Sequence, residues 1–175
     1  MLECVYHDDD DDVANRTYKA AFIASLILQQ DMSVLKDVCI TTDNRIPERI
    51  FAYNSFDEFS SQKLGLNVHT VAEDAFICSK AKKIDINGKN ELILEPACFC
   101  GIESKYTNYV SAGNYLDIGI RAFSNSNLYE LKLKAASHIN MKINSISHST
   151  IDTLIIDTPR LMRAMSLPAP PLLRI

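Results

Sequence analysis

Apolar and polar positions alternate along Tyr129–Asn144. The odd positions are mainly apolar and the even positions mainly polar, and the odd ones read Tyr129, Leu131, Leu133, Ala135, Ser137, Ile139, Met141 and Ile143. A period of two places one set of side chains on each face of a pleated strand. The stretch is longer than a typical strand, so we expect a break near Ala136–His138. A half-buried antiparallel sheet is the expected setting for this pattern.

The same alternation occurs on both sides of an Asn-Gly pair. Ile84 and Ile86 alternate with polar residues before Asn87-Gly88, and Leu92 and Leu94 alternate after it. Asn-Gly between two such runs favours a tight turn, because both residues accept a positive φ. The pattern therefore predicts a β-hairpin over Lys82–Leu94.

Two further strands are expected at Tyr115–Phe123 and Ile151–Asp157, and Glu103–Asn114 between them reads as a polar, turn-rich loop. Strands joined by short turns indicate an antiparallel meander of about four strands in the C-terminal half.

The first half of the chain favours helices. A helix is expected over Val13–Gln30, and its nearly all-round apolar surface indicates burial on several sides. Ser55–Glu58 and Thr70–Glu73 have the spacing of capping boxes, so each predicts the start of a short helix. No internal repeat is evident. The predicted fold is a single α+β domain over residues 1–165, followed by an extended Pro-rich tail over 166–175.

Charge and cysteine content set the class of protein. The net charge of −4 disfavours broad nucleic-acid binding, and no apolar run reaches the length of a bilayer-spanning helix. The five cysteines are scattered and no secretory signal is visible, so we expect reduced thiols in a cytoplasmic compartment. Cys98 and Cys100 form the one close pair, which we interpret as buried structural cysteines rather than a zinc site.

Five consecutive aspartates, Asp8–Asp12, precede the predicted helix. The pattern His7-x-Asp9-x-Asp11 resembles the first motif of the DHH phosphoesterases, although Asp12 stands where that motif has glycine. Asp9-x-Asp11-x-Val13 is similar to the first motif of the haloacid-dehalogenase-type phosphatases. Either resemblance implies a small phosphohydrolase in which Asp9 and Asp11 hold Mg²⁺ or Mn²⁺. The competing interpretation is a solvated acidic cap on the helix.

Two candidate partner-binding segments stand out. The polar face of the alternating stretch carries lysines, and the tail is rich in proline. No aromatic residue alternates with the lysines along the chain, which weakens a single-stranded nucleic-acid site. The candidate contact residues are Lys132, Lys134, Lys142, Pro168, Pro170, Pro171 and Leu172.

No catalytic constellation or cofactor motif is evident. The leading hypothesis is a non-catalytic structural or assembly subunit that acts through protein–protein contacts, by self-association or with another protein; a viral or phage structural protein is one class that fits. The alternatives are the metal-dependent phosphohydrolase and an adaptor or inhibitor module that binds one protein partner.

Overall fold

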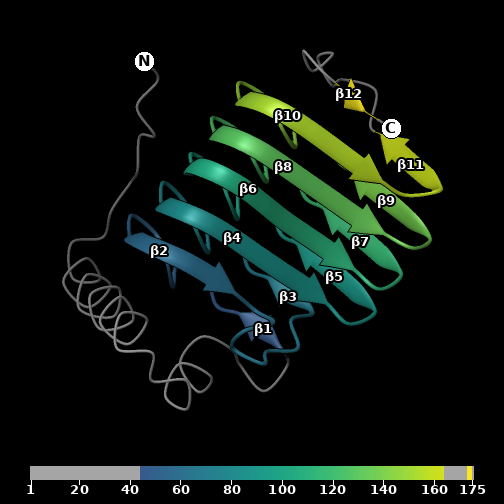
Figure 1. Ribbon diagram of the computed structural model, residues 1–175, viewed down its shortest axis with the longest axis horizontal. Helices are drawn as coiled ribbons and strands as arrows, with labels where there is room; N and C mark the ends of the chain where they lie inside the picture. The colour runs from purple at the N-terminus through teal and green to yellow at the C-terminus, as the bar shows by residue number, and fades with distance from the viewer. Residues whose placement is uncertain (1–43, 164–172, 175) are drawn as a thin grey trace.

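The computed structural model describes residues 44–163 and 173–174 of the chain, and these residues form a β-solenoid. Strands with even numbers make one six-stranded sheet in the order β12-β10-β8-β6-β4-β2, here called the long sheet. Strands with odd numbers make a second six-stranded sheet in the order β1-β3-β5-β7-β9-β11, the short sheet. Every pairing is parallel. Successive coils therefore lie on one another, with the two sheets facing each other (Figure 1).

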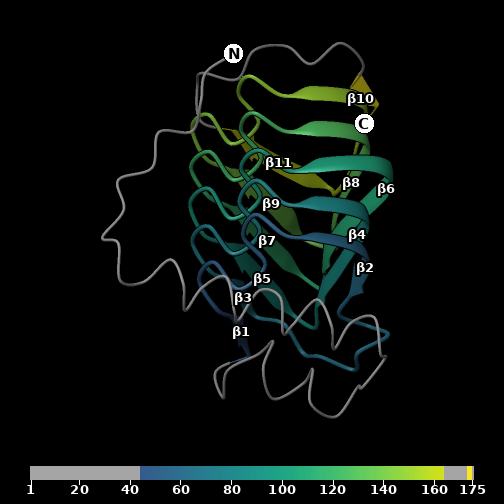
Figure 2. The same ribbon diagram turned by 90° about the vertical axis from the view of Figure 1, so that its left-hand side faces the viewer.

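Each coil consists of one long-sheet strand, a corner, one short-sheet strand and a return turn, and Figure 2 shows the turns of neighbouring coils stacked. The strands of the long sheet are β2 Ser55–Ser60, β4 Lys80–Gly88, β6 Glu103–Ala112, β8 Asn127–Ala135, β10 Thr150–Asp157 and β12 Leu173–Arg174. The strands of the short sheet are β1 Arg45–Ile46, β3 Thr70–Val71, β5 Glu91–Leu94, β7 Tyr115–Ile118, β9 His138–Met141 and β11 Arg160–Arg163.

The predicted α+β class with an antiparallel meander is wrong. Lys80 pairs with Glu103, and Asn127 pairs with Thr150, so each strand meets its partner one coil later. The chain that links two parallel partners is a strand of the opposite sheet with its turns, where most parallel sheets use a helix. The described residues contain no helix, and the predicted helix over Val13–Gln30 lies outside them.

An internal repeat is present, contrary to the sequence prediction. Within residues 44–163 the registers join residues 22 to 25 positions apart, from His138 with Arg160 to Ser55 with Lys80, and β12 pairs with β10 at a separation of 19. The repeat is hard to see in the sequence because its length varies from coil to coil.

The two apolar runs beside Asn87-Gly88 are strands, as predicted, but they do not form a hairpin. β4 lies in the long sheet and β5 in the short sheet, so they belong to opposite walls of one coil. Gly88 is required for space: a Cβ there would lie 2.6 Å from the carbonyl oxygen of Glu91. The tight corner, rather than a positive φ, accounts for this glycine.

Other local predictions fail for related reasons. The capping-box segments starting at Ser55 and Thr70 begin strands β2 and β3, because pairing with neighbouring coils outweighs their local helix signals. The expected loop over Glu103–Asn114 contains β6, the longest strand. The strand expected over Tyr115–Phe123 ends at Ile118.

The alternating stretch behaves largely as predicted. Its apolar side chains are buried, and the strands break between β8 and β9, where Ala136 and Ser137 form the corner. Tyr129 and Ile143 are the exceptions, because 56% and 44% of these residues, respectively, are exposed. The buried members are Leu131, Leu133, Ala135, Ile139 and Met141. The strand predicted at Ile151–Asp157 is confirmed as most of β10.

A column of phenylalanines fills the return-turn side of the interior. The ring of Phe76 stacks on Phe51 at 4.6 Å between centroids and on Phe99 at 4.9 Å, and Phe99 stacks on Phe123 at 5.0 Å. These four residues, called the phenylalanine stack, occupy one position per coil, and Ile146 takes that position in the next coil. Backbone bonds keep the turns in register, including Phe99 N to the carbonyl of Ala122 at 2.8 Å.

The return turns use left-handed backbone at residues other than glycine. Each turn has two such residues four positions apart, for example Ala97 with φ 54° and Gly101 with φ 69°. The non-glycine members of these pairs are Arg49, Tyr53, Asp74, Cys78, Ala97, Arg121, Asn125, Asn144 and His148. This conformation is costly for L residues, so the bonded column of turns must hold it.

Candidate partner-binding surface

A bulge in β6 shapes the centre of the long sheet's outer face. Ser104 pairs with Leu128 and Thr107 pairs with Glu130, so β6 contains one more residue than β8 over this interval. The register to β4 shifts in the same way, from Lys80 with Glu103 to Asp85 with Tyr109. A bulge re-aims side chains locally. Here it leaves both Lys105 and Tyr106 exposed, with 57% of Tyr106 in solvent.

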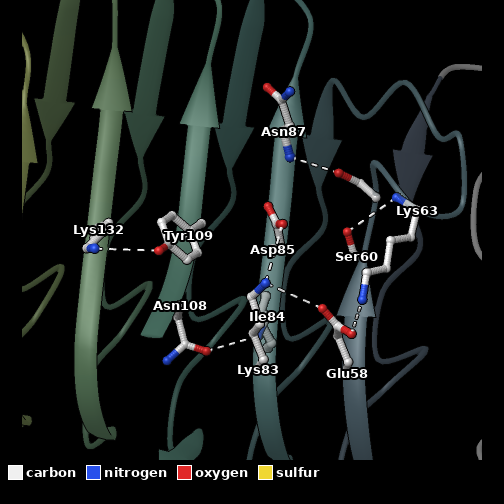
Figure 3. A network of polar contacts seen from close by, with 11 residues as sticks. Glu58, Ser60, Lys63, Lys83, Ile84, Asp85, Asn87, Asn108, Tyr109 and Lys132 are labelled. Atoms are coloured by element: carbon white, nitrogen blue, oxygen red, sulfur yellow. Dashed lines mark hydrogen bonds and ion pairs between the residues drawn. The ribbon is translucent and has the colours of Figure 1, made fainter. Parts of the chain in front are cut away.

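Asn108 stabilises this bulge from the interior side of the sheet. Its side chain is buried, and its Oδ1 accepts a hydrogen bond from the backbone N–H of Ile84 at 2.9 Å (Figure 3). Its Nδ2 donates to the carbonyl oxygens of Tyr106 at 2.9 Å and Glu130 at 3.3 Å. One side chain therefore bonds to the backbones of β4, β6 and β8 where the regular ladder is interrupted. The position of Tyr106 is fixed by a buried polar contact.

Tyr109 lies between two lysines from neighbouring strands. The Nζ of Lys83 on β4 is 5.4 Å from the ring centroid, and the Nζ of Lys132 on β8 is 5.1 Å from it. Lys132 also donates to the Tyr109 hydroxyl at 3.5 Å, as Figure 3 shows. Both distances fall within the range of cation–π attraction. These contacts orient two ammonium groups at the centre of the sheet.

We define the Lys–Tyr surface as six residues on the outer face of β4, β6 and β8. None of the six is buried, and the most exposed tyrosines are Tyr106 and Tyr129, on adjacent strands. Within residues 44–163, Lys105 forms no ion pair, so its ammonium is available to a ligand. The members are Lys83, Lys105, Tyr106, Tyr109, Tyr129 and Lys132.

Carboxylates next to this surface hold their charge. A hydrogen bond donated by the Thr107 hydroxyl at 2.6 Å lowers the pKa of Glu130, and Lys132 at 3.3 Å lowers it further against the opposing effect of burial. Burial lowers the pKa of Lys132, but hydrogen bonds to Glu130 and Tyr109 outweigh it, so the net pKa is raised. Lys132 therefore stays protonated well above neutral pH.

A second acidic neighbour lies on β2. Contact with Lys63 at 2.5 Å is the main cause of the lowered pKa of Glu58, which also meets Lys83 at 3.4 Å (Figure 3). Lys83 lies between this carboxylate and Asp85 at 3.9 Å. The lowered pKa keeps Glu58 ionised at neutral pH, so this carboxylate holds Lys83 in place while the lysine ammonium stays near the Tyr109 ring.

Charge is not evenly spread over the long sheet. The strands β4, β6 and β8 together carry six lysines and three acidic residues, a net charge of +3. The flanking strands β2 and β10 each carry two acidic residues and no basic one. None of these charged residues is buried, so all of them face outwards. The face therefore has a basic, tyrosine-bearing centre between two acidic margins.

The structure separates the lysines that the sequence grouped together. Lys132 belongs to the Lys–Tyr surface, and Lys134 lies farther along β8, paired with Asp157 of β10 at 2.7 Å. Lys142 follows β9 on the short sheet and pairs with Asp117 at 2.9 Å. The candidates Asp9, Asp11, Pro168, Pro170, Pro171 and Leu172 lie outside the described residues. Of the tail, β12 pairs with β10.

Sequence reasoning missed four of the six residues named here, Lys83, Lys105, Tyr106 and Tyr109, and did not assign Tyr129 to a binding surface. No tyrosine alternates with the lysines along the chain, but the coil places Tyr109 of β6 beside Lys132 of β8, 23 positions later. The missing signal was the repeat, since a search at spacings of 23 or 24 residues brings aromatic and basic positions together.

The outer face of the short sheet has a different character. The Tyr115 and His138 rings approach to 4.3 Å between centroids, and the Asn140 amide donates to Asp117 at 2.8 Å. Burial is the main cause of the raised pKa of Tyr115. Asp117 bonds to both Asn140 and Lys142 on this face. The described strands of the short sheet also carry no exposed tyrosine pair comparable to Tyr106 and Tyr129.

The three described cysteines lie in the return turns, and Cys78 is only half-buried. Cys98 and Cys100 are both buried, as predicted, though they lie in a turn and not in a strand. Burial raises the pKa of the Cys98 thiol well above its usual value, so the thiolate is disfavoured. Across residues 44–163 and 173–174, no group of three or more His, Cys, Asp or Glu side chains is arranged to hold a metal ion.

No family model, curated protein or solved structure matches this chain. In the part of the chain that the structure describes, there is no helix of the length and apolarity needed to cross a membrane.

Proposed function

We propose that this protein is a non-catalytic assembly subunit that binds another protein through the Lys–Tyr surface. The observation that supports it is the β6 bulge, which exposes Lys105 and Tyr106 and is held by the buried Asn108 side chain. A bulge fixed in this way is a deliberate feature of a sheet. Its effect is to add contact groups to an otherwise regular face.

Tyrosine is well suited to protein recognition. It brings a large amphipathic surface and loses little side-chain entropy, and it is enriched at the energetic centres of interfaces. Tyr106 and Tyr129 stand on neighbouring strands of a bonded sheet, so they are already positioned before a partner arrives. A rigid pair of this kind supports binding without any rearrangement of the solenoid.

Charge selects the class of partner. A net charge of +3 over β4, β6 and β8 favours an acidic segment, which the margins on β2 and β10 would confine to the centre. Consider a face-to-face dimer whose two-fold axis runs along β6. Strand β4 of one copy would lie over β8 of the other, and both strands carry a net positive charge. Strand β2 would likewise lie over β10, and both of these carry a net negative charge. The charge order therefore favours an acidic segment of a different surface over this symmetric dimer.

The cysteines support a reducing compartment as part of this proposal. A reducing cytoplasm fits five cysteines of which Cys98 is kept in its protonated form by burial. The alternative phosphohydrolase gains no observation, because Asp9 and Asp11 lie outside the described residues.

The test is fluorescence anisotropy with a labelled, alternating glutamate–alanine peptide and the full chain. Tyr106→Ala and Lys105→Gln should each weaken binding about fivefold, the loss of roughly 1 kcal/mol expected for a central contact. Lys142→Gln on the short sheet is the matched control and should bind as the parent does. A lysine–alanine peptide and an oligothymidine serve as comparators.

Three results would contradict the proposal: no binding of the acidic peptide by any form of the chain, equal binding by the Tyr106 and Lys142 variants, or tighter binding of the oligothymidine. Light scattering on the same samples measures self-association; an oligomer that Tyr106→Ala dissolves would show that the partner is a second copy.

A further inference from the structure

We propose that the aspartate run Asp8–Asp12 of the same chain binds the Lys–Tyr surface and competes there with the partner. This inference rests on the proposed function, because it assigns the regulation of the same surface. It joins the most acidic segment in the sequence to the most basic part of the described fold.

The charges are complementary. Residues 1–15 contain Glu3 and Asp8–Asp12 and no lysine or arginine, so this segment carries six negative charges. The central strands β4, β6 and β8 carry a net charge of +3 and include Lys105, which has no ion-pair partner within residues 44–163. Close opposite charges attract by about 1 kcal/mol in water and more near a protein surface. Several such contacts at once make the run a suitable ligand.

The dimensions also agree. Five extended residues span about 17 Å at a rise of roughly 3.3 Å each. The three strands β4, β6 and β8 lie about 4.8 Å apart, so the outer two are separated by about 10 Å. The run is therefore long enough to cross all three strands and meet lysines on each of them. A single aspartate would reach only one of the three.

The chain between the two parts is long enough. Thirty-one residues separate Asp12 from Asn44, and a fully extended chain of that length reaches about 100 Å. The helix predicted over Val13–Gln30 would shorten this reach to about 70 Å. The chain enters the solenoid at β1, beside the end of the long sheet that carries β2 and β4 (Figure 1). Either distance is enough to arrive at the Lys–Tyr surface.

The same chain is favoured over a second copy as the source of the run. A covalent link within one chain raises the local concentration of a ligand to about the millimolar range. A second copy at micromolar concentration competes poorly with that. The run therefore acts first on its own surface, and an incoming acidic partner must displace it.

The experiment is zero-length carbodiimide cross-linking of the full chain, which joins carboxylates to lysines, followed by tryptic peptide mapping. The peptide Met1–Arg16 should be joined to peptides containing Lys83, Lys105 or Lys132. The pairs Lys134–Asp157 at 2.7 Å and Lys80–Glu103 at 3.2 Å provide internal positive controls. About 1 M salt should reduce the Met1–Arg16 products at least tenfold, because it shortens the Debye length to about 3 Å.

A mixture of ¹⁵N-labelled and unlabelled chains separates the two sources. Products of a single isotopic type support binding within one chain. Products that mix the isotopes overturn the proposal and assign the contact to a second copy. Controls that react while Met1–Arg16 does not, or reaction mainly at Lys142, overturn it as well.

A substituted full chain provides a second readout. Replacing all five residues of Asp8–Asp12 by asparagine should tighten binding of the glutamate–alanine peptide at least threefold, because the competitor is removed. An unchanged affinity overturns the inference while leaving the proposed function intact. The proposed function fails separately if neither the parent nor this variant binds the peptide.

Discussion

The phenylalanine stack and the Lys–Tyr surface are both products of the same coil, but they use the repeat differently. Inside, one residue type recurs: Phe51, Phe76, Phe99 and Phe123 stack at 4.6 to 5.0 Å. Outside, successive coils present different groups, and one strand gains an extra residue. The interior keeps the repeat, and the outer face departs from it.

This difference shows where each kind of constraint acts. Stacked rings require equal geometry in every coil, because a missing ring leaves a void between its neighbours. An outward side chain meets only its neighbours and solvent, so it can vary without loss of stability. The bulge in β6 interrupts the register on both of its sides, and it is therefore the place where binding is expected.

The largest effect should come from the stack. Phe99→Ala removes a buried ring that contacts rings on both sides, and should lower the free energy of unfolding by about 3–5 kcal/mol. Tyr106→Ala, which removes an exposed ring from the outer face, should change it by less than about 0.5 kcal/mol. Urea unfolding followed by circular dichroism measures both. Similar losses for the two variants would contradict the contrast between interior and surface.

Glycine substitutions at the corners and turns should have the next largest effect on the free energy of unfolding. A Cβ at Gly113 would lie 2.1 Å from the carbonyl oxygen of Lys89, so Gly113→Ala must move backbone and should cost about 1–3 kcal/mol. Gly101→Ala places a Cβ 3.0 Å from the Cys78 sulfur at a positive φ that other coils fill with non-glycine residues. It should cost about 1 kcal/mol. Thermal unfolding that ranks Gly101→Ala as the more damaging would contradict this.

Asn108 joins the two regions, because it is buried and yet holds the outer bulge. Asn108→Ala leaves the Ile84 N–H and the two carbonyls without this partner, and should cost about 1–3 kcal/mol. It should also weaken binding of the acidic peptide although it touches no ligand. Ser111→Ala, on the same strand, is the control for both measurements. Normal peptide affinity in a destabilised Asn108 variant would show that the bulge does not need this support.

The smallest effect concerns an ion pair at the edge of the short sheet. Arg45 on β1 binds Glu95 in a two-pronged contact with one branch at 2.7 Å, and this hydrogen bonding lowers the pKa of Glu95. The folded pKa is below the unfolded value of about 4.3, so the pair stabilises the fold above that pH and stops doing so as pH falls through the folded pKa.

Near neutral pH, Glu95→Gln should therefore lower the free energy of unfolding by at most about 1 kcal/mol, because the pair is partly exposed. In strong acid the substitution should leave the free energy of unfolding unchanged. Glu48→Gln, at the more exposed end of the same arginine, is the control. Urea unfolding at a series of pH values checks it. A penalty that persists in acid would assign the effect to packing.

Part of the fold could be predicted from sequence. Burial of Leu131, Leu133 and Ile139 follows from alternation, which depends only on local geometry. The partner of each strand could not, because parallel pairing joins residues of different coils, and alternation carries no information about which strand lies alongside. The return turns could not be predicted for another reason. Asp74, Ala97 and Arg121 adopt a positive φ there, and these residue types do not signal a turn as glycine does.

The candidate surface shows the same limit. Lys132 was identified from its polar face within one strand, whereas Tyr109 was not, because it comes from the preceding coil. The spacing of Phe76, Phe99 and Phe123 was the available signal for the repeat. Aligning the coils on that column would have placed Tyr109 within one residue of Lys132, and the bulge in β6 accounts for the remaining offset.

The most direct test of a specialised outer face is chemical-shift mapping on the ¹⁵N-labelled full chain during titration with the glutamate–alanine peptide. We predict that the shifts concentrate on β4, β6 and β8, with the largest near Lys105, Tyr106 and Tyr129, and that the short sheet stays unchanged. Shifts centred on His138 and Lys142, or spread evenly over both sheets, would contradict the assignment of binding to the Lys–Tyr surface.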